Sequence, residues 1–188
     1  MVDRDIRGAL RKRLDEAHRD DSATLLLDEL GVCEGRARVD MAVVNGTLAG
    51  FEIKSDEDTL VRLPRQVEAY ERVFDFTTLV VGTKHADRAV DLLPSTWGVL
   101  CAVEDEREVA LEPRRSAERN NNVDPFCVAQ LLWRDEALAL LERHGLERGL
   151  RSKPRHVLWR ALADQLSQDD LASAVRDQLR SRVGWRSG

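Results

Sequence analysis

The sequence predicts an α/β protein with a mixed central sheet flanked by helices and an all-helical C-terminal region. Asn45-Gly46 stands between two apolar runs, which is typical of a β-hairpin. The apolar run Phe76 to Gly82 follows a helical segment, so we expect it to pair in parallel with the hairpin. Beyond residue 125, apolar residues recur at helical spacing.

The chain has 188 residues, of which 43% are hydrophobic and 34% charged, which fits one globular domain with a helical appendage. Residues 113–124 (PRRSAERNNNVD) lack periodicity and contain three consecutive asparagines. We therefore predict a core over 1–112, a linker or mobile loop over 113–124, and a helical region over 125–188.

The N-terminal part, from Asp5 to Leu30, is predicted to be helical. Its second helix would run from Ala23 to Leu30 and end at Gly31. Glu29 would then lie in the last turn, where the helix dipole disfavours a carboxylate. It would need a surface position, a basic neighbour or a metal ion.

The hairpin contains two carboxylates at positions where apolar residues are expected, Asp40 and Glu52. A two-residue loop at Asn45-Gly46 would place them on opposite faces. A loop of three residues, or a bulge at Gly50, would bring Asp40, Glu52 and Lys54 to one face. We expect one of these, because it also gives the other face a continuous apolar surface.

The rest of the core alternates helices with strands. Residues 55–58 are expected to open one helix, and Pro64 to begin another that presents Gln66 and Tyr70 on one face. The remaining elements are a helix over 86–93, a strand over 98–103 and an edge strand over 108–111. Beyond the linker, helices are expected over 125–144, 157–166 and 171–183.

Bulk features exclude several classes of protein. No apolar run is long enough to cross a membrane, and the N-terminus lacks the apolar core of a signal peptide, so a cytoplasmic location is expected. The cysteines, Cys33, Cys101 and Cys127, are too scattered for a disulfide framework or a zinc site and are expected to be buried thiols. The net charge of −5 argues against nucleic-acid binding by bulk electrostatics.

Asp40, Glu52 and Lys54 together have the chemistry of a metal-dependent phosphodiesterase. Carboxylates bind Mg²⁺, which polarises a phosphate and acidifies a bound water. A lysine beside the metal can orient that water or stabilise charge in the transition state. The same residues would also suit a solvent-facing edge strand, since so short a motif recurs by chance. Because carboxylates crowd together at such a site, removal of Asp40 or Glu52 should relieve like-charge repulsion and leave the fold intact or slightly stabilised.

These residues resemble the PD-(D/E)XK phosphodiesterase superfamily, with Asp40 as its first acid and Glu52-Ile53-Lys54 as its second motif. Glu29 resembles a glutamate that many members carry on a helix before the hairpin. Gln66-Val-Glu-Ala-Tyr70 resembles the Q-x-x-x-Y signature of the branch related to the RecB nuclease domain. The segment GFEIKSDEDTLVRLPRQVEAY closely resembles a family of bacterial and phage proteins assigned to this superfamily.

The resemblance implies a restriction-endonuclease-like fold with the element order α-β-β-β-α-β, for which one strand before Asp40 is still missing. It implies a Mg²⁺- or Mn²⁺-dependent deoxyribonuclease, with Glu29, Asp40 and Glu52 as metal ligands, Lys54 positioning water, and Gln66 at the substrate phosphate or the water. The alternative is a catalytically silent module of the same fold that serves nucleic-acid binding or protein assembly.

The C-terminal region contains a basic run that includes Arg151, Lys153 and Arg155, and we expect these residues to contact DNA. The alternatives for this region are a homodimer interface and a helical cap that completes the core. Three tryptophans, Trp97, Trp133 and Trp159, are expected to be core anchors; exposure of one in the helical region would favour base stacking instead.

Overall fold

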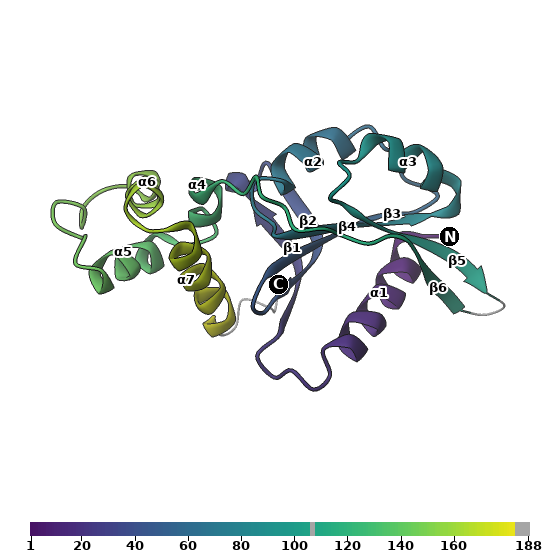
Figure 1. Ribbon diagram of the computed structural model, residues 1–188, viewed down its shortest axis with the longest axis horizontal. Helices are drawn as coiled ribbons and strands as arrows, with labels where there is room; N and C mark the ends of the chain where they lie inside the picture. Colours follow the sequence, from purple (N-terminus) through teal and green to yellow (C-terminus); the bar gives the residue numbers. More distant parts are fainter. Residues whose placement is uncertain (106–107, 183–188) are drawn as a thin grey trace.

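The computed structural model describes residues 1–105 and 108–182, which form a six-stranded mixed sheet with helices on both faces and a group of helices at one end (Figure 1). The strands follow one another across the sheet in chain order. They are β1 (Leu25–Val32), β2 (Ala37–Val44), β3 (Leu48–Lys54), β4 (Phe76–Gly82), β5 (Gly98–Asp105) and β6 (Glu108–Arg115). Only the β3–β4 and β4–β5 pairs are parallel. The predicted fold class and the parallel crossover are therefore confirmed.

Two helical layers cover the sheet. Helix α1 (Asp3–Ala17) lies on one face, while α2 (Leu63–Tyr70) and α3 (Ala86–Leu92) cover the other (Figure 1). Spacing of four in α1 buries Ile6, Leu10 and Leu14 against the sheet. Short 3-10 turns follow β1 and β4; they are η1 (Cys33–Gly35) and η2 (Thr83–His85).

The second predicted N-terminal helix is wrong, because residues 25–32 form strand β1. Its leucines at 27 and 30 are both buried in the main core, although strict alternation would place them on opposite faces. Glu29 between them has φ 56°, a left-handed conformation that shifts the alternation by one residue. The resulting spacing of three imitates a helix. With β1 in place, the elements from α1 to β4 follow the expected order α-β-β-β-α-β.

The segment before α2 also differs from expectation. Residues 55–58 form a turn and not a helix, because the carboxylate of Asp58 accepts hydrogen bonds from the backbone N–H and the hydroxyl of Ser55. The helix predicted to begin near Pro64 is confirmed as α2.

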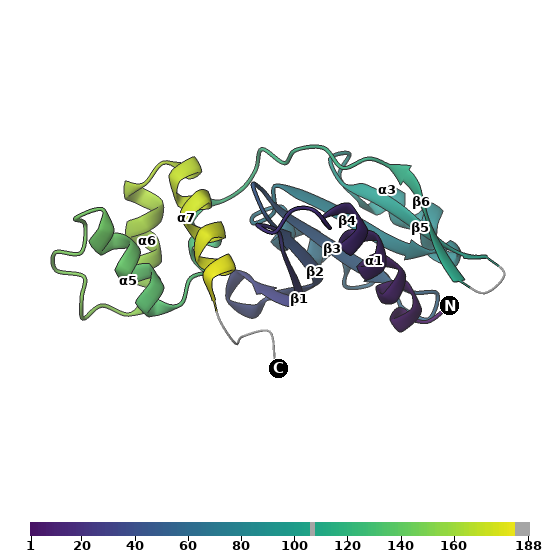
Figure 2. The same cartoon turned by 90° about the horizontal axis from the view of Figure 1, so that it is seen from below.

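The C-terminal region is helical, as predicted. Its helices are α4 (Pro125–Ala129), α5 (Arg134–Arg143), α6 (Arg155–Gln165) and α7 (Gln168–Ser181). The expected single helix over 125–144 is divided at Trp133, and residue 183 of the expected last helix lies outside the described residues. Figure 2 shows the four helices gathered beyond the β1 side of the sheet.

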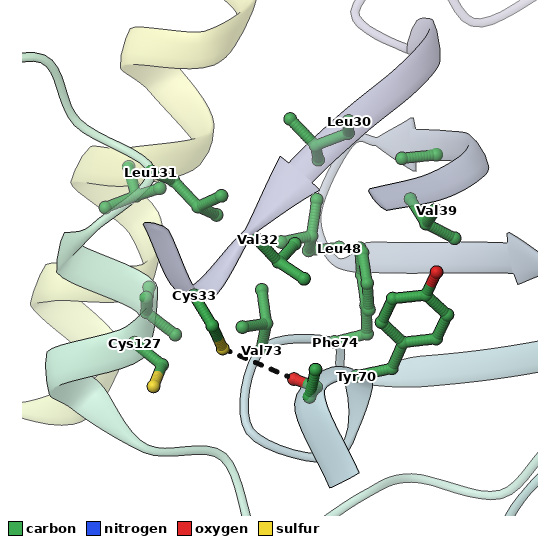
Figure 3. Close-up of a cluster of buried hydrophobic side chains, with 14 of the residues drawn as sticks. Leu30, Val32, Cys33, Val39, Leu48, Tyr70, Val73, Phe74, Cys127 and Leu131 are labelled. Carbon is green, nitrogen blue, oxygen red and sulfur yellow. Dashed lines mark hydrogen bonds between the residues drawn. The ribbon is translucent and has the colours of Figure 1, made fainter. Parts of the chain in front are cut away.

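The C-terminal helices share one apolar core with the sheet. Cys127 and Leu131 lie beside Val32 and Cys33 (Figure 3). All three cysteines are buried and free, as expected. Among the described residues, no helix has both the length and the apolar character that crossing a membrane requires.

The segment predicted as a linker is joined to the core by hydrogen bonds. Its first residues, 113–115, belong to β6. The buried side chain of Asn120 donates to the carbonyl oxygens of Glu71 and Phe74, at 2.6 and 3.0 Å. Asp124 caps α4 and forms an ion pair with Arg72 at 2.6 Å. The division into three parts stays a prediction.

Candidate functional site

The hairpin turn sets the register of the predicted site. Val44 pairs with Leu48, so the loop has three residues, which is the first of the two expected solutions. The ladder continues without a bulge through Gly50 to the pair of Met41 and Phe51. The alternative of a bulge at Gly50 is therefore wrong. Gly50 instead lies close to the ring of Phe74, which leaves no room for a side chain.

Asp40 lies where the regular hairpin pairing ends. One carboxylate oxygen, Oδ2, accepts a hydrogen bond of 2.7 Å from the backbone N–H of Ile53 on β3. The side chain thus takes the place of a main-chain carbonyl between β2 and β3. This bond fixes the carboxylate next to Glu52 and Lys54, with which it lines one cavity.

Glu52 is the centre of a buried polar cluster on the α2 face of the sheet. Its side chain is 2% exposed, and that of Lys54 is 6% exposed. The ammonium of Lys54 and the amide of Gln66 both donate to Oε1 of Glu52. The hydroxyl oxygen of Tyr70 lies 2.7 Å from Oε2. Strand alternation brings Glu52 and Lys54 together, and helical spacing of four brings Gln66 and Tyr70 to the same carboxylate.

Burial raises the pKa of Glu52 above its ordinary value, and the nearby charge of Asp40 raises it further, while the Lys54 ammonium opposes both. The hydroxyl of Tyr70 also lies 2.7 Å from the carbonyl oxygen of Arg38. A hydroxyl donates a single proton, so it can satisfy only one of these two acceptors at a time. A proton on Oε2 of Glu52 would satisfy both contacts.

Arg7, on α1, contacts both of the other predicted metal ligands, Asp40 and Glu29. Its guanidinium donates to Oδ1 of Asp40 at 2.8 Å and lies 3.3 Å from Oε1 of Glu29. It also donates to the carbonyl oxygen of Asp40 at 3.1 Å. Arg38 pairs with Oε2 of Glu29 at 2.7 Å. Glu29 therefore has basic neighbours, one of the three conditions expected for it, although it lies on a strand.

Sequence reasoning missed Arg7 and Arg38, because their contacts depend on how β1, β2 and α1 pack. One signal was present: Arg7 adjoins Ile6 in the apolar stripe of α1, next to the face that packs on the sheet.

The predicted metal ligands, Lys54 and Gln66 all line one cavity of 650 Å³. Its lining includes five carboxylates and five cationic side chains; these are Asp3, Glu29, Asp40, Glu52, Asp58, Arg36, Arg38, Lys54, Arg62 and Arg65. The lining is thus formally neutral in an acidic protein. Arg36, Arg62 and Arg65 are exposed and form no ion pair with another residue in the described part of the chain.

The three predicted metal ligands, Glu29, Asp40 and Glu52, are already paired with cations. Over residues 1–105 and 108–182, no group of three or more Asp, Glu, His or Cys side chains is arranged to hold a metal ion. The donor chemistry nonetheless suits Mg²⁺, since Glu29, Asp40 and Glu52 all line the cavity with oxygen ligands. In addition, the buried Oε1 of Gln66 has no hydrogen-bond partner within the described part of the chain and needs a donor or a cation.

The predicted nucleic-acid residues of the helical region are partly neutralised. Arg151 forms an ion pair with Glu142 and a second one with Glu147, at 3.5 Å. Arg155 lies 3.4 Å from Glu34 on η1, the turn that leads to the arginines of the cavity. Lys153 is exposed and has no ion-pair partner among the residues described.

Trp133 is not the expected core anchor. Trp97 and Trp159 are buried, but Trp133 is 57% exposed. It precedes α5 at the N-cap position, where its backbone N–H donates to Glu136 at 2.7 Å. The guanidinium of Arg182 lies 4.3 Å from the ring centroid. Exposure was the condition that favours base stacking, so Trp133 becomes a candidate contact for nucleic acid.

Comparisons with known proteins point to phages. Residues 3–187 match the family described as Bacteriophage P4 protein cII. One similar curated protein is Protein cII of Enterobacteria phage P4, which is 27% identical over 125 residues, covering 66% of this chain and 47% of that protein. The chain thus spans about half the length of this relative. No solved structure matches. Neither description states an activity.

Proposed function

The chain belongs to the family of Bacteriophage P4 protein cII, and we propose that this member is a metal-dependent nuclease that hydrolyses phosphodiester bonds in DNA. The observation that carries the proposal is the buried cluster of Glu52, Lys54 and Gln66, which shares one cavity with Asp40. A buried carboxylate–lysine pair costs desolvation energy and is weak support for stability alone. Buried ionisable pairs that cost desolvation energy cluster at functional sites, so this pair supports a functional role.

Each residue has a proposed role in the reaction. Asp40, Glu52 and Glu29 would hold Mg²⁺ or Mn²⁺, which when bound polarises the phosphate and acidifies a water molecule. The Lys54 ammonium, fixed by Glu52, would position that water and stabilise negative charge on the phosphate. Gln66 would use its unpartnered Oε1 to orient the water or a metal-bound group.

The substrate class follows from the rim of the cavity. Arginine binds phosphate oxygens through two parallel N–H donors. Arg36, Arg62 and Arg65 are exposed and without ion pairs in the described chain, so a polyanion is the matching ligand. This local cluster weakens the objection from net charge, because the lining of the cavity is formally neutral and three of its arginines are exposed.

A catalytically silent module of the same fold is the second candidate. It is favoured by the pairing of Asp40 and Glu29 with Arg7, which places a guanidinium between two proposed metal ligands. In that case the arginine rim would bind nucleic acid without cleavage.

Cleavage of labelled single- and double-stranded DNA, and of RNA, in Mg²⁺ or Mn²⁺ separates these functions. We expect metal-dependent cleavage by the parent protein, none by Lys54→Met, and unchanged cleavage by Lys12→Met. Lys12 is the control because it is exposed on α1, and among the described residues its ion-pair partner is Glu108, at 3.4 Å. Lys54→Met should retain Mn²⁺ in a calorimetric titration, since lysine is not a ligand.

Two results would contradict the nuclease proposal. One is cleavage by Lys54→Met at the parent rate. The other is a parent protein that binds DNA but neither binds Mn²⁺ nor cleaves; this result would establish the silent module.

A further inference from the structure

A second, smaller hollow adjoins the candidate site. It has a volume of 320 Å³ and is formed by η1 and the residue that follows it, by α2, and by the residue two positions after α2. Its lining consists of three arginines, one glutamate and two uncharged residues; these are Arg36, Arg65, Arg72, Glu68, Cys33 and Ala69. Arg36 and Arg65 also line the cavity that contains Glu52 and Lys54, so these two side chains lie between the two spaces.

The charge of the hollow suits a phosphate group. Its lining carries three guanidinium groups against one carboxylate, so its formal charge is positive in a protein whose net charge is −5. Among the described residues, Arg72 is the one of these three arginines with an ion-pair partner, Asp124 at 2.6 Å. Guanidinium groups that converge from separate elements bind tetrahedral oxyanions through charge-assisted hydrogen bonds.

The floor of the hollow adds no competing polar group. The thiol of Cys33 donates to the carbonyl oxygen of Ala69, at 3.7 Å, and so satisfies that acceptor within the protein (Figure 3). Burial also raises the pKa of Cys33, which keeps the thiol neutral. An anion in the hollow would therefore meet three arginines, one glutamate and two uncharged residues, Cys33 and Ala69.

We propose that this hollow is a subsite for a backbone phosphate of DNA, one that neighbours the phosphodiester in the catalytic cavity. The inference rests on the proposed function, and it deepens it by assigning a path to the strand. That path passes from Lys54 over Arg36 and Arg65 to Arg72. A strand is favoured over an isolated anion because the two spaces share the same arginines, as consecutive phosphates on one backbone would require.

Glu68 provides a test that does not threaten the fold, because it is the one carboxylate of the hollow and is exposed on α2. Glu68→Gln should tighten binding of a fluorescein-labelled 12-nucleotide DNA about two- to fivefold, as expected for one screened charge. The control is Glu57→Gln, an exposed glutamate outside both spaces, which should change nothing. Arg65→Gln should weaken binding and lower the salt slope by about 1.

Neutral linkages locate the contact on the strand. Single methylphosphonate substitutions, placed one at a time along the 12-mer, remove the charge of one phosphate each. The gain in DNA affinity from Glu68→Gln should disappear when one particular linkage is neutral and persist when any other linkage is neutral, as in a double-mutant cycle. A gain that is equal at every position, or equal to that of Glu57→Gln, overturns the subsite.

Two further measurements distinguish a DNA subsite from a free-anion site, and failure of the subsite from failure of the nuclease proposal. If inorganic phosphate alone binds in calorimetry and Glu68→Gln strengthens only that binding, the hollow is a free-anion site and the strand assignment is wrong. All binding is measured in EDTA, without turnover. A missing cleavage activity with an intact methylphosphonate pattern would therefore remove the nuclease function and leave the DNA subsite.

Discussion

Pairing between opposite charges, and not repulsion between like charges, governs the site at the scale of single residues. Asp40 has Arg7 as a partner, Glu52 has Lys54, and Glu29 has both Arg7 and Arg38. These pairs argue against the expectation that removal of Asp40 relieves crowding, and its carboxylate also accepts a hydrogen bond from the backbone N–H of Ile53. Asp40→Ala should destabilise the protein, because it leaves a partly buried guanidinium and a backbone donor without their acceptor.

Arg7 should compete with a metal ion for Asp40 and Glu29. Arg7→Gln is expected to bind Mn²⁺ at least about fivefold more tightly than the parent. It should also lose about 1–2 kcal/mol of unfolding free energy without metal, since Asp40 loses a charged partner. Calorimetry and urea denaturation measure the two effects, with Arg4→Gln, 93% exposed on the same helix, as the control. Unchanged Mn²⁺ affinity would show that Arg7 does not occupy the ligand positions.

Glu52 should make stability depend on pH. Because burial raises its pKa, the folded protein holds this proton more tightly than the unfolded chain. Unfolding free energy should therefore decrease as pH rises from the ordinary carboxyl range through the raised pKa, and level off above it. Glu52→Gln should remove this slope, and its amide could donate to Tyr70. Thermal melts across this range test the prediction, with Glu57→Gln as the control that keeps the parent slope.

Residues of the site that are close in sequence were accessible to prediction, and those that are distant were not. Asp40, Glu52 and Lys54 follow from strand alternation once the loop length is set, and Gln66 and Tyr70 from helical spacing. Arg7 reaches Asp40 across a separation of 33 residues, which no local pattern encodes.

Local irregularity decided which elements could be predicted. The positive φ of Glu29 shifts the alternation of β1, so its buried leucines acquired a helix-like spacing. Strands β4 and β5 contain short apolar runs, residues 79–81 and 99–103, and were identified from them. An irregular backbone conformation within a strand is thus the physical reason for the largest error in the predicted fold.

At the scale of the element, a substitution at Gly50 tests how tightly the β2–β3 hairpin packs against Phe74. A Cβ atom there would lie 3.0 Å from three ring atoms of Phe74, a fully buried side chain that has little room to move. Gly50→Ala should therefore cost about 1–3 kcal/mol in urea denaturation. Gly8→Ala, on α1 with nothing within 4 Å, should instead stabilise by about 0.5–1 kcal/mol. An equal gain at both positions would contradict the packing described for the hairpin.

The C-terminal helices complete the main core at the scale of the whole molecule. Buried residues of α4 and α7 belong to the same apolar cluster as those of β1, β2 and α2. A helical cap was one of the three alternatives weighed for this region, and the shared core favours it. The role of Arg151, Lys153 and Arg155 in DNA binding stays a prediction beside it.

A truncation that ends at Glu118 should therefore aggregate. It would expose the apolar surface that α4 and α7 cover, and it would remove Asn120 from the carbonyl oxygens of Glu71 and Phe74. Size-exclusion chromatography beside the full chain measures the outcome. A monomeric fragment with cooperative unfolding would show that the sheet and its own helices form an independent domain.

The two faces of the sheet are covered unequally. The α2 and α3 side joins the large core, whereas α1 rests on a separate cluster of nine buried residues. Elements with a small share of apolar contacts open locally before the molecule unfolds as a whole. Helix α1 carries Arg7, so such an opening would remove this guanidinium from Asp40 and Glu29 without disturbing the strands that hold them, while Arg38 on β2 would stay paired with Glu29. Access of a cation to these carboxylates would then be set by the detachment rate of one helix.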